Sequence, residues 1–311
     1  MLKYILRRLL LLIPILLGVI LLIMFIMDLT PGDPATLLLG INATPEAVQQ
    51  LNDELGFNDP LLVQYADYII GIVHGDLGTS WQTSRSVFGE ILSRFPVTLK
   101  LAVFSIILTA IIGIPLGIIS AIKKYSVLDM ICTSGAMIFT SLPRFWLGMM
   151  LILFFSVQLG WLPSNGIGTW KHYILPVFTL AAPTAAKIMR LTRTTMLETI
   201  RSDYVRTARS KGASERRIIA HHELKNAILP VVTTLGIEFG QLLGGAILIE
   251  TVFSMQGIST LMINAIRMKD TTLVTGSIVF FATMVCLTML VIDLVYTVID
   301  PRIRTKYTKS S

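Results

Sequence analysis

The sequence predicts an all-α membrane protein with six transmembrane helices, and two observations support that prediction. Of its 311 residues, 53% are hydrophobic and only 14% are charged, whereas about a quarter of the residues of a soluble domain are charged. The hydrophobic residues also fall in runs close to the roughly 20 residues that a helix needs to cross a bilayer. Residues 9–27, for example, contain no charged side chain. These features exclude a soluble globular fold.

The first apolar run, residues 9–27, is interpreted as an uncleaved transmembrane helix. Lys3, Arg7 and Arg8 precede it, as basic residues also precede the core of a signal peptide. A signal peptide, however, has a shorter apolar core followed by a small-residue cleavage site, whereas this run leads directly into Asp28-Leu29-Thr30-Pro31. Five further spans are expected at residues 99–122, 131–158, 173–191, 229–249 and 273–299.

Two of these runs carry residues that modify a helix. The third contains Ser141-Leu142-Pro143-Arg144, and we expect a break or tilt there because proline removes a helix hydrogen bond. The fifth run is rich in small residues that permit close helix packing. These are Gly236, Gly240, Gly244 and Gly245.

Lysine and arginine accumulate in the cytoplasmic loops of membrane proteins, and their distribution predicts the orientation. With the N-terminus inside, 19 of the 26 basic residues fall in cytoplasmic segments. The loop at residues 28–98 then lies outside, with only Arg85 and Arg94 against nine acidic residues. An even number of spans puts both termini in the cytoplasm. The pI of about 9.5 therefore reflects topology, and no basic patch interleaved with aromatic residues indicates nucleic-acid binding.

The cytoplasmic loop at residues 193–228 is long enough to fold and is predicted to contain two short helices. Ser202 or Asp203 can cap the first, and Gly212 can end it in a left-handed conformation. Ser214 can cap a second helix that runs toward the fifth span.

We call residues 203–217 the knob, because two short helices joined at a glycine protrude from a membrane. The loop around it is strongly basic, with ten Lys and Arg residues between Lys187 and Lys225. Such a surface suits either a helix pair held on anionic lipid or a rigid contact with a soluble partner.

The outer loop contains enough apolar residues to form a small folded cap. Pro45 suits the first turn of a helix, so residues 45–51 are expected to be helical. Residues 61–73 read as a second helix, and Gly75-Asp76-Leu77-Gly78 as a turn. Such a cap either docks a partner or packs on the ends of the spans.

Short motifs follow one another in order along the whole chain. They are Pro31-Gly32-Asp33-Pro34, Gly56-Phe57-Asn58-Asp59-Pro60, Gly75-Asp76-Leu77-Gly78, Ser141-Leu142-Pro143-Arg144-Phe145-Trp146, Asp203-Tyr204-Val205-Arg206-Thr207-Ala208, Glu250-Thr251-Val252-Phe253-Ser254 and Asp300-Pro301-Arg302-Ile303-Arg304. The ordered set resembles the B-type permease subunit of the peptide/nickel (dipeptide/oligopeptide) family of binding-protein-dependent ABC transporters. The chain departs from the general Glu-Ala-Ala pattern of such permeases at Arg206-Thr207-Ala208. It also has Gln256 where proline is usual, and Thr271-Thr272 where Tyr-Pro is usual.

The resemblance implies the permease subunit of an ATP-driven importer with a type I ABC transmembrane domain, located in the bacterial inner membrane. Residues 1–27 would be the first helix, 28–93 an extracytoplasmic cap, 94–300 the permease core and 301–311 a cytoplasmic tail. Di- or oligopeptides are the expected substrates, and nickel chelates or glutathione-like compounds are the alternative.

By the same resemblance, the partners would be a second homologous permease subunit, one or two ABC ATPase subunits and an extracytoplasmic substrate-binding protein that docks on the cap. ATP and Mg would bind to the ATPase subunits, and no cofactor is expected in this chain. The knob would fit a cleft on an ATPase. The expected coupling residues are Asp203, Tyr204, Arg206, Thr207, Ala208, Lys211, Gly212 and Ala213.

Ionisable residues within spans are functional candidates by default. Arg144 and Glu238 are candidates to pair across the pathway, or for one of them to contact a terminus of a peptide substrate. The alternatives are that Arg144 lies near a helix break exposed to water and that Asp293 is a helix-packing residue near the inner face. The phosphate-binding Gly-x4-Gly-Lys-Ser/Thr motif and the His-Glu-x-x-His and Gly-x-Ser-x-Gly motifs are absent from the sequence, so an enzyme is not expected. A secondary transporter would show inverted repeats, and none is visible.

Overall fold

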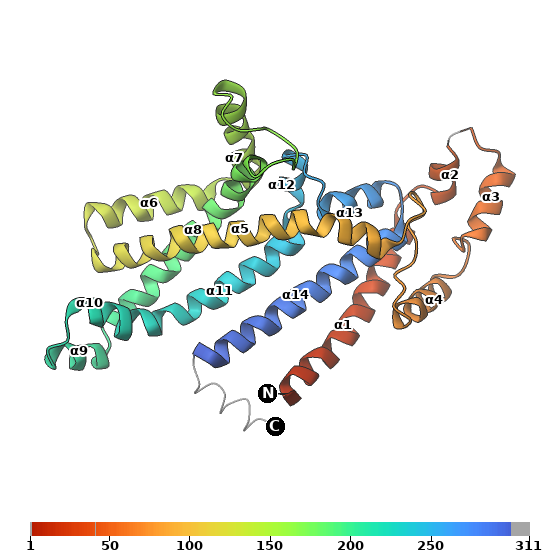
Figure 1. Ribbon diagram of the computed structural model, residues 1–311. Coiled ribbons are helices and arrows are strands. Elements are labelled where there is room, and N and C mark those ends of the chain that lie inside the picture. Colours follow the sequence, from red (N-terminus) through yellow and green to blue (C-terminus); the bar gives the residue numbers. More distant parts are fainter. Residues whose placement is uncertain (1, 41, 300–311) are drawn as a thin grey trace. The chain divides into compact units, whose positions relative to one another are not determined.

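The computed structural model describes residues 2–40 and 42–299, and its regular elements in these ranges are helices (Figure 1). Within the same ranges, strand-like pairing is limited to one isolated bridge between Thr79 and Ser86. The expected tail at residues 301–311 lies outside the described residues, and the side chain of Asp293 is not described either.

The chain forms two compact units. Among the described residues, unit 1 contains those up to Thr98 together with Gln256–Leu287, and unit 2 contains Leu99–Met255 together with residues 288–299. Two long helices, α5 (Val87–Ile122) and α14 (Thr271–Ile299), contribute to both units.

The predicted six spans fit the helices of the described residues. Five helices there are long and apolar enough to cross a membrane, and the count reaches six when a helix pair bent by 101° is taken as one span. The five are α1 (Leu2–Leu29), α5, α8 (Lys171–Ile200), α11 (Leu224–Gly245) and α14; the bent pair is α6 (Val127–Ser141) followed by α7 (Arg144–Leu151) and the π-helical η1 (Ile152–Gln158).

The bend lies at the predicted break. Leu142 and Pro143 are both extended, with ψ angles of 130°. A residue that precedes proline avoids the helical region, and proline itself cannot donate the next helix hydrogen bond. A second interruption was not predicted: the run expected at residues 229–249 ends at Gly245, and a short helix, α12 (Ile247–Val252), begins after Ala246.

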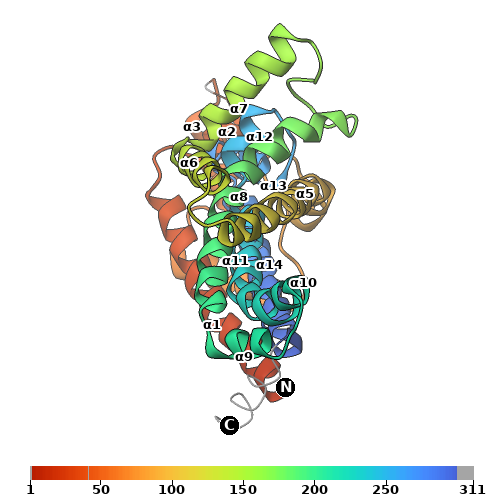
Figure 2. The same ribbon diagram turned by 90° about the vertical axis from the view of Figure 1, so that its left-hand side faces the viewer.

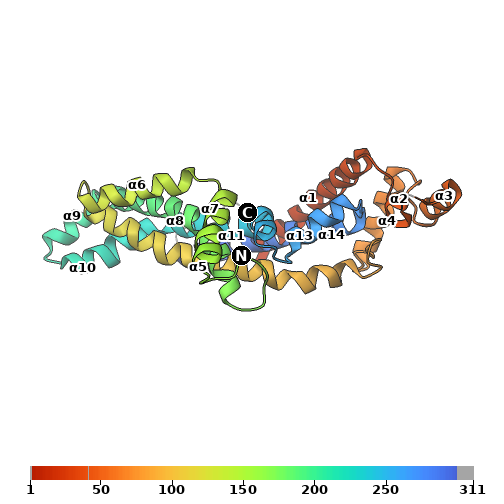
Figure 3. The ribbon, with the colours of Figure 1, turned by 90° about the horizontal axis from the view of Figure 1, so that it is seen from above.

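In unit 1, part of the segment that follows α1 packs against α1. Ile20 and Met24 of α1 form a buried cluster with Val279 of α14, and apolar side chains of α4 pack on this cluster. Figure 3 shows the ribbons of these three helices. The hydroxyl of Tyr65 donates a hydrogen bond of 3.2 Å to the Leu17 carbonyl oxygen. The short helices of the unit are α2 (Pro34–Leu39), α3 (Pro45–Glu54), α4 (Leu61–Val73) and α13 (Ile258–Arg267), so both helices predicted in the outer loop are present.

Unit 2 is built around α8, the most buried of the long helices. Gly113 and Gly117 of α5 allow this helix to approach α8 closely: a Cβ atom on Gly117 would lie only 2.5 Å from Cβ of Thr192. This Gly-x-x-x-Gly spacing is typical of tightly packed membrane helices. At one end of the unit, α9 (Asp203–Ser210) and α10 (Glu215–Arg217) lead through η2 (Ile218–Glu223) into α11 (Figure 2).

Candidate functional site

The knob has the two-helix structure that its sequence predicts. Gly212 adopts a φ of +78°, which glycine tolerates because it has no Cβ atom. Ser202 and Ser214 occupy the two N-cap positions. Neither hydroxyl makes the predicted capping hydrogen bond, however, and that of Ser202 donates instead to the Thr199 carbonyl oxygen at 2.6 Å.

Buried contacts fix the knob to the end of unit 2. Val205 of α9 and Ile218 of η2 are fully buried. Arg209 forms an ion pair with Glu215 at 2.7 Å, and its second nitrogen lies 3.9 Å from the buried carboxylate of Glu223. The two helices are therefore tied to each other on both sides of Gly212.

The surface of the knob carries most of the expected coupling residues. Ala208 and Ala213 are half-buried. The exposed ones are Asp203, Tyr204, Arg206, Thr207, Lys211 and Gly212. A rigid element with exposed polar side chains has the form that a mechanical contact requires.

The two candidate pathway residues do not pair with each other in the described structure, so that part of the prediction is wrong. The Glu238 side chain is only 4% exposed and accepts a hydrogen bond of 2.6 Å from Nζ of Lys187, whose side chain is 53% exposed. Nη2 of Arg144 donates to the Thr184 hydroxyl at 3.4 Å. Sequence reasoning counted Lys187 only as a topology signal, although its place in a predicted span marked it as a functional candidate.

The open face of α8 is polar, although α8 belongs to a membrane-spanning unit. Between residues 175 and 198 its exposed positions are Lys187, Arg190, Thr194 and Glu198. Their spacing of three, four and four residues puts them on one side of a helix. We call these four residues the α8 stripe.

A second ionic group, missed from the sequence, joins α5, α6 and α8. The buried carboxylate of Asp129 binds Arg193 through two hydrogen bonds of 2.7 and 2.8 Å. It also accepts from the Ser120 hydroxyl and from the backbone N–H of Tyr125. Since all the hydrogen-bonding capacity of this carboxylate is used within the chain, it holds the helix ends together.

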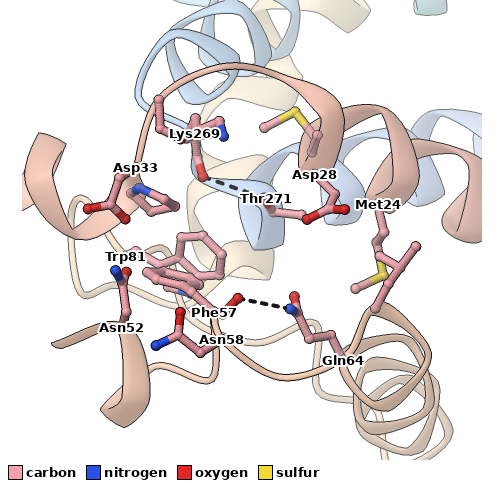
Figure 4. Close-up of a pocket in the computed structure, with 14 residues that line it drawn as sticks. Met24, Asp28, Asp33, Asn52, Phe57, Asn58, Gln64, Trp81, Lys269 and Thr271 are labelled. Carbon is pink, nitrogen blue, oxygen red and sulfur yellow. Dashed lines mark hydrogen bonds between the residues drawn. The ribbon is translucent and has the colours of Figure 1, made fainter. Parts of the chain in front are cut away.

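In unit 1, a polar cavity of about 220 Å³ lies beside the end of α1 (Figure 4). Asp33 caps α2 by accepting hydrogen bonds from the N–H and hydroxyl of Thr36. Burial alone would raise the pKa of Asp33, but hydrogen bonds from Thr36 and Asn52 outweigh it and hold this pKa below its usual value. The other polar or aromatic lining residues include Asp28, Asn52, Phe57, Asn58, Gln64, Trp81, Lys269 and Thr271.

Lys269 and Asp270, which directly precede α14, form hydrogen bonds with the segment after α1 and with the segment before α5. Lys269 donates a hydrogen bond of 2.6 Å to the Gly32 carbonyl oxygen. The buried carboxylate of Asp270 accepts from the Ser80 hydroxyl at 2.6 Å and from the Leu273 N–H at 3.0 Å. Thr271, one of the two threonines at the Tyr-Pro position of the family pattern, lines the cavity.

Among the described residues, no group of three or more His, Cys, Asp or Glu side chains is arranged to hold a metal ion.

Helices long enough to span a membrane, a buried carboxylate paired with a lysine of α8, and a knob between two of the spans are consistent with a membrane transport component. Family models agree: residues 113–305 match the binding-protein-dependent transport system inner membrane component, and residues 1–102 match the N-terminal model of such membrane components. The chain belongs to this family and is a permease of the peptide/nickel group. It is a multi-pass inner-membrane subunit of an ABC importer and not itself an enzyme, since separate subunits hydrolyse ATP.

Curated relatives match along almost the entire chain. The glutathione transport system permease protein GsiC of Escherichia coli strain K12 is 42% identical over 306 residues, which are 98% of this chain and 100% of the relative. GsiC of Salmonella typhimurium strain LT2 gives the same identity and coverage.

Solved structures support the fold. An inward-facing methionine ABC transporter, MetNI, matches with a TM-score of 0.57 and 20% identity, over 68% of this chain and 97% of the solved one. An amino acid ABC transporter matches with a TM-score of 0.52 and 17% identity, over 67% and 94% of the two chains. The predicted type I ABC transmembrane fold is therefore confirmed.

Proposed function

We propose that this chain forms one half of the translocation pathway of a short-peptide importer, with glutathione as the first compound to test. The observation behind this proposal is the 42% identity to glutathione permease subunits across 98% of the chain. Glutathione is a small peptide, so the proposal joins the expected peptide substrate to the named substrate of these relatives.

In this proposal the other half of the pathway is a second homologous permease, and one or two ATPase subunits bind the cytoplasmic side. Both termini and the knob lie in the cytoplasm, which the distribution of basic residues supports. The cap at residues 28–93 lies outside and docks the substrate-binding protein. Residues 94–300 form the permease core.

The knob transmits ATPase closure to the spans. Its exposed residues Tyr204 and Arg206 contact the ATPase, while the ion pairs of Arg209 make the two knob helices move as one body. Continuity of η2 with α11 supports this role, because displacement of the knob then reaches a spanning helix directly.

Within the spans, Arg144, Lys187 and Glu238 line the pathway. Charged groups at membrane depth face a water-filled space or one another rather than lipid. The half-exposed ammonium of Lys187 above the buried Glu238 carboxylate fits that placement.

Coupling is tested with Arg206→Glu and Gly212→Asp in the full complex, reconstituted in proteoliposomes with its binding protein. We expect ATP-dependent uptake to fall at least tenfold while the complex still assembles, because charge reversal opposes docking and the new side chain strains the left-handed turn. Lys171→Glu, at the far end of α8, is the matched control. Undiminished uptake in both knob variants would refute the coupling role.

The substrate is tested in the same proteoliposomes with labelled glutathione, trialanine and a nickel–histidine chelate. Uptake of either peptide and not of the chelate supports the proposal. Uptake of the chelate alone would assign the complex to the metal-chelate branch of the family.

A further inference from the structure

The α8 stripe differs chemically from the open face of α1. The exposed positions of α1 are mostly leucine, isoleucine and phenylalanine, including Leu10, Leu22 and Phe25, as expected for a helix that faces lipid. The α8 stripe presents an ammonium, a guanidinium, a hydroxyl and a carboxylate instead. Because such groups are costly in hydrocarbon, this face of α8 belongs to an aqueous space or to a polar partner.

Positive charge is in excess around the first half of the stripe. Lys187 and Arg190 are three residues apart, which puts them about 4.5 Å apart along the axis and on neighbouring positions of one face. Arg144 reaches Thr184, one turn before Lys187. Glu238 is the carboxylate paired with this group, and Lys187 already engages it.

Arg190 of the stripe and the nearby Arg144 are cations that no described carboxylate neutralises. Among the side chains that the structure describes, none forms a salt bridge with either of them, whereas Arg193 is fully engaged by Asp129. Arg190 lies at the end of the span expected at residues 173–191 that is cytoplasmic in the proposed orientation, where water or an anion from outside the chain can balance its charge. Guanidinium groups bind carboxylates with two parallel hydrogen bonds, which adds directional specificity.

We propose that Lys187 and Arg190 bind the free carboxylate of the transported peptide, and that Glu238 is a positioning residue that holds Lys187. This inference rests on the proposed peptide-import function and adds to it a substrate requirement imposed by the permease as well as by the binding protein. The site lies on one of the two permease subunits that form the pathway, so a change in the position of the second subunit alters access to the bound carboxylate.

The test measures maximal uptake rates of trialanine and of its C-terminal amide by the reconstituted complex. Both are supplied at concentrations that saturate the binding protein, checked by its intrinsic fluorescence, so that its own preference no longer affects the rate. We expect the wild-type complex to transport the free acid roughly tenfold faster than the amide, the effect of one charge-assisted hydrogen bond.

The informative variant is Arg190→Gln, with Arg190→Lys as the charge-preserving variant and Lys171→Gln as the matched control. In Arg190→Gln the acid should slow about tenfold while the amide is unaffected, so that the ratio of the two rates approaches one. Arg190→Lys should restore part of the preference, and Lys171→Gln should leave it intact. The double variant Lys187→Gln/Glu238→Gln, which removes both charges together, should also lower the ratio.

Three outcomes would overturn the inference. Equal wild-type rates for acid and amide would show that the permease does not read the carboxylate, and equal slowing of both substrates in Arg190→Gln would indicate a structural role. Loss of the second permease from purified Arg190→Gln complexes would identify the anion as a carboxylate of that subunit. If the wild-type complex moved neither peptide, the proposed function itself would fail, and that result is distinct because no ratio could be measured.

Discussion

The ends of α5, α6 and α8 and the knob each contain an arginine–carboxylate pair with the same 2.7 Å contact, but in opposite surroundings. The Asp129 side chain is 5% exposed, while that of Glu215 in the knob is 63% exposed. Removal of one partner from a buried pair leaves an uncompensated charge and costs about 3–5 kcal/mol. An exposed pair contributes only about 0–1 kcal/mol. The same contact distance therefore stabilises the fold at the helix ends, whereas in the knob it only orients two exposed helices relative to each other.

The strongest test of this comparison is Asp129→Ala. It leaves Arg193, the Ser120 hydroxyl and the Tyr125 N–H without their shared acceptor, and we expect a loss of about 3–5 kcal/mol of stability. The measurement is thermal unfolding of the detergent-solubilised complex, followed by fluorescence-detected gel filtration. Asp129→Leu combined with Arg193→Met should recover a large part of the loss. A single variant as stable as wild type would show that this network does not hold the helix ends.

An intermediate effect is expected for Lys187→Met, since Lys187 is half-exposed and only Glu238 is buried. The unpaired Glu238 carboxylate should cost about 1–3 kcal/mol, measured by the same unfolding assay. Lys187→Met/Glu238→Leu should be more stable than Lys187→Met alone, because the orphaned charge is gone. Failure of the second substitution to rescue stability would contradict the ion pair.

The smallest effect on stability is expected for Arg209→Gln in the knob, because solvent screens its exposed ion pair with Glu215. Transport should nevertheless fall more than stability does, because the two knob helices lose the contacts that make them move together. Unfolding temperature and ATP-dependent uptake of the same preparation provide the comparison. A large drop in unfolding temperature would place this pair with the structural ones, with the contact to buried Glu223 as the cause.

Several features followed from the sequence because they depend on residues close together in the chain. Pro143 breaks the third span, Pro45 begins a helix, and Gly212 takes the left-handed turn between the knob helices. Close packing at Gly236 was also predicted, and a Cβ atom there would lie 2.2 Å from the Ile292 side chain. The ordered motifs also indicated the correct family, because each motif is a run of neighbouring residues that can be recognised without knowing the fold.

Only the tertiary structure decided which charged groups meet. Lys187 and Glu238 are 51 residues apart, and Asp129 and Arg193 are 64 residues apart. Local rules on a helix reach only three or four residues, so they could not show that Glu238 pairs with Lys187 rather than with Arg144. Nor could they show that the one open face of α8 is its polar stripe, since that depends on which sides of α8 its neighbours cover. The sequence by itself determined the approximate spans, the break at Pro143 and the family. Helix packing, which is set by contacts between distant segments, determined the ion pairs and the open face of α8.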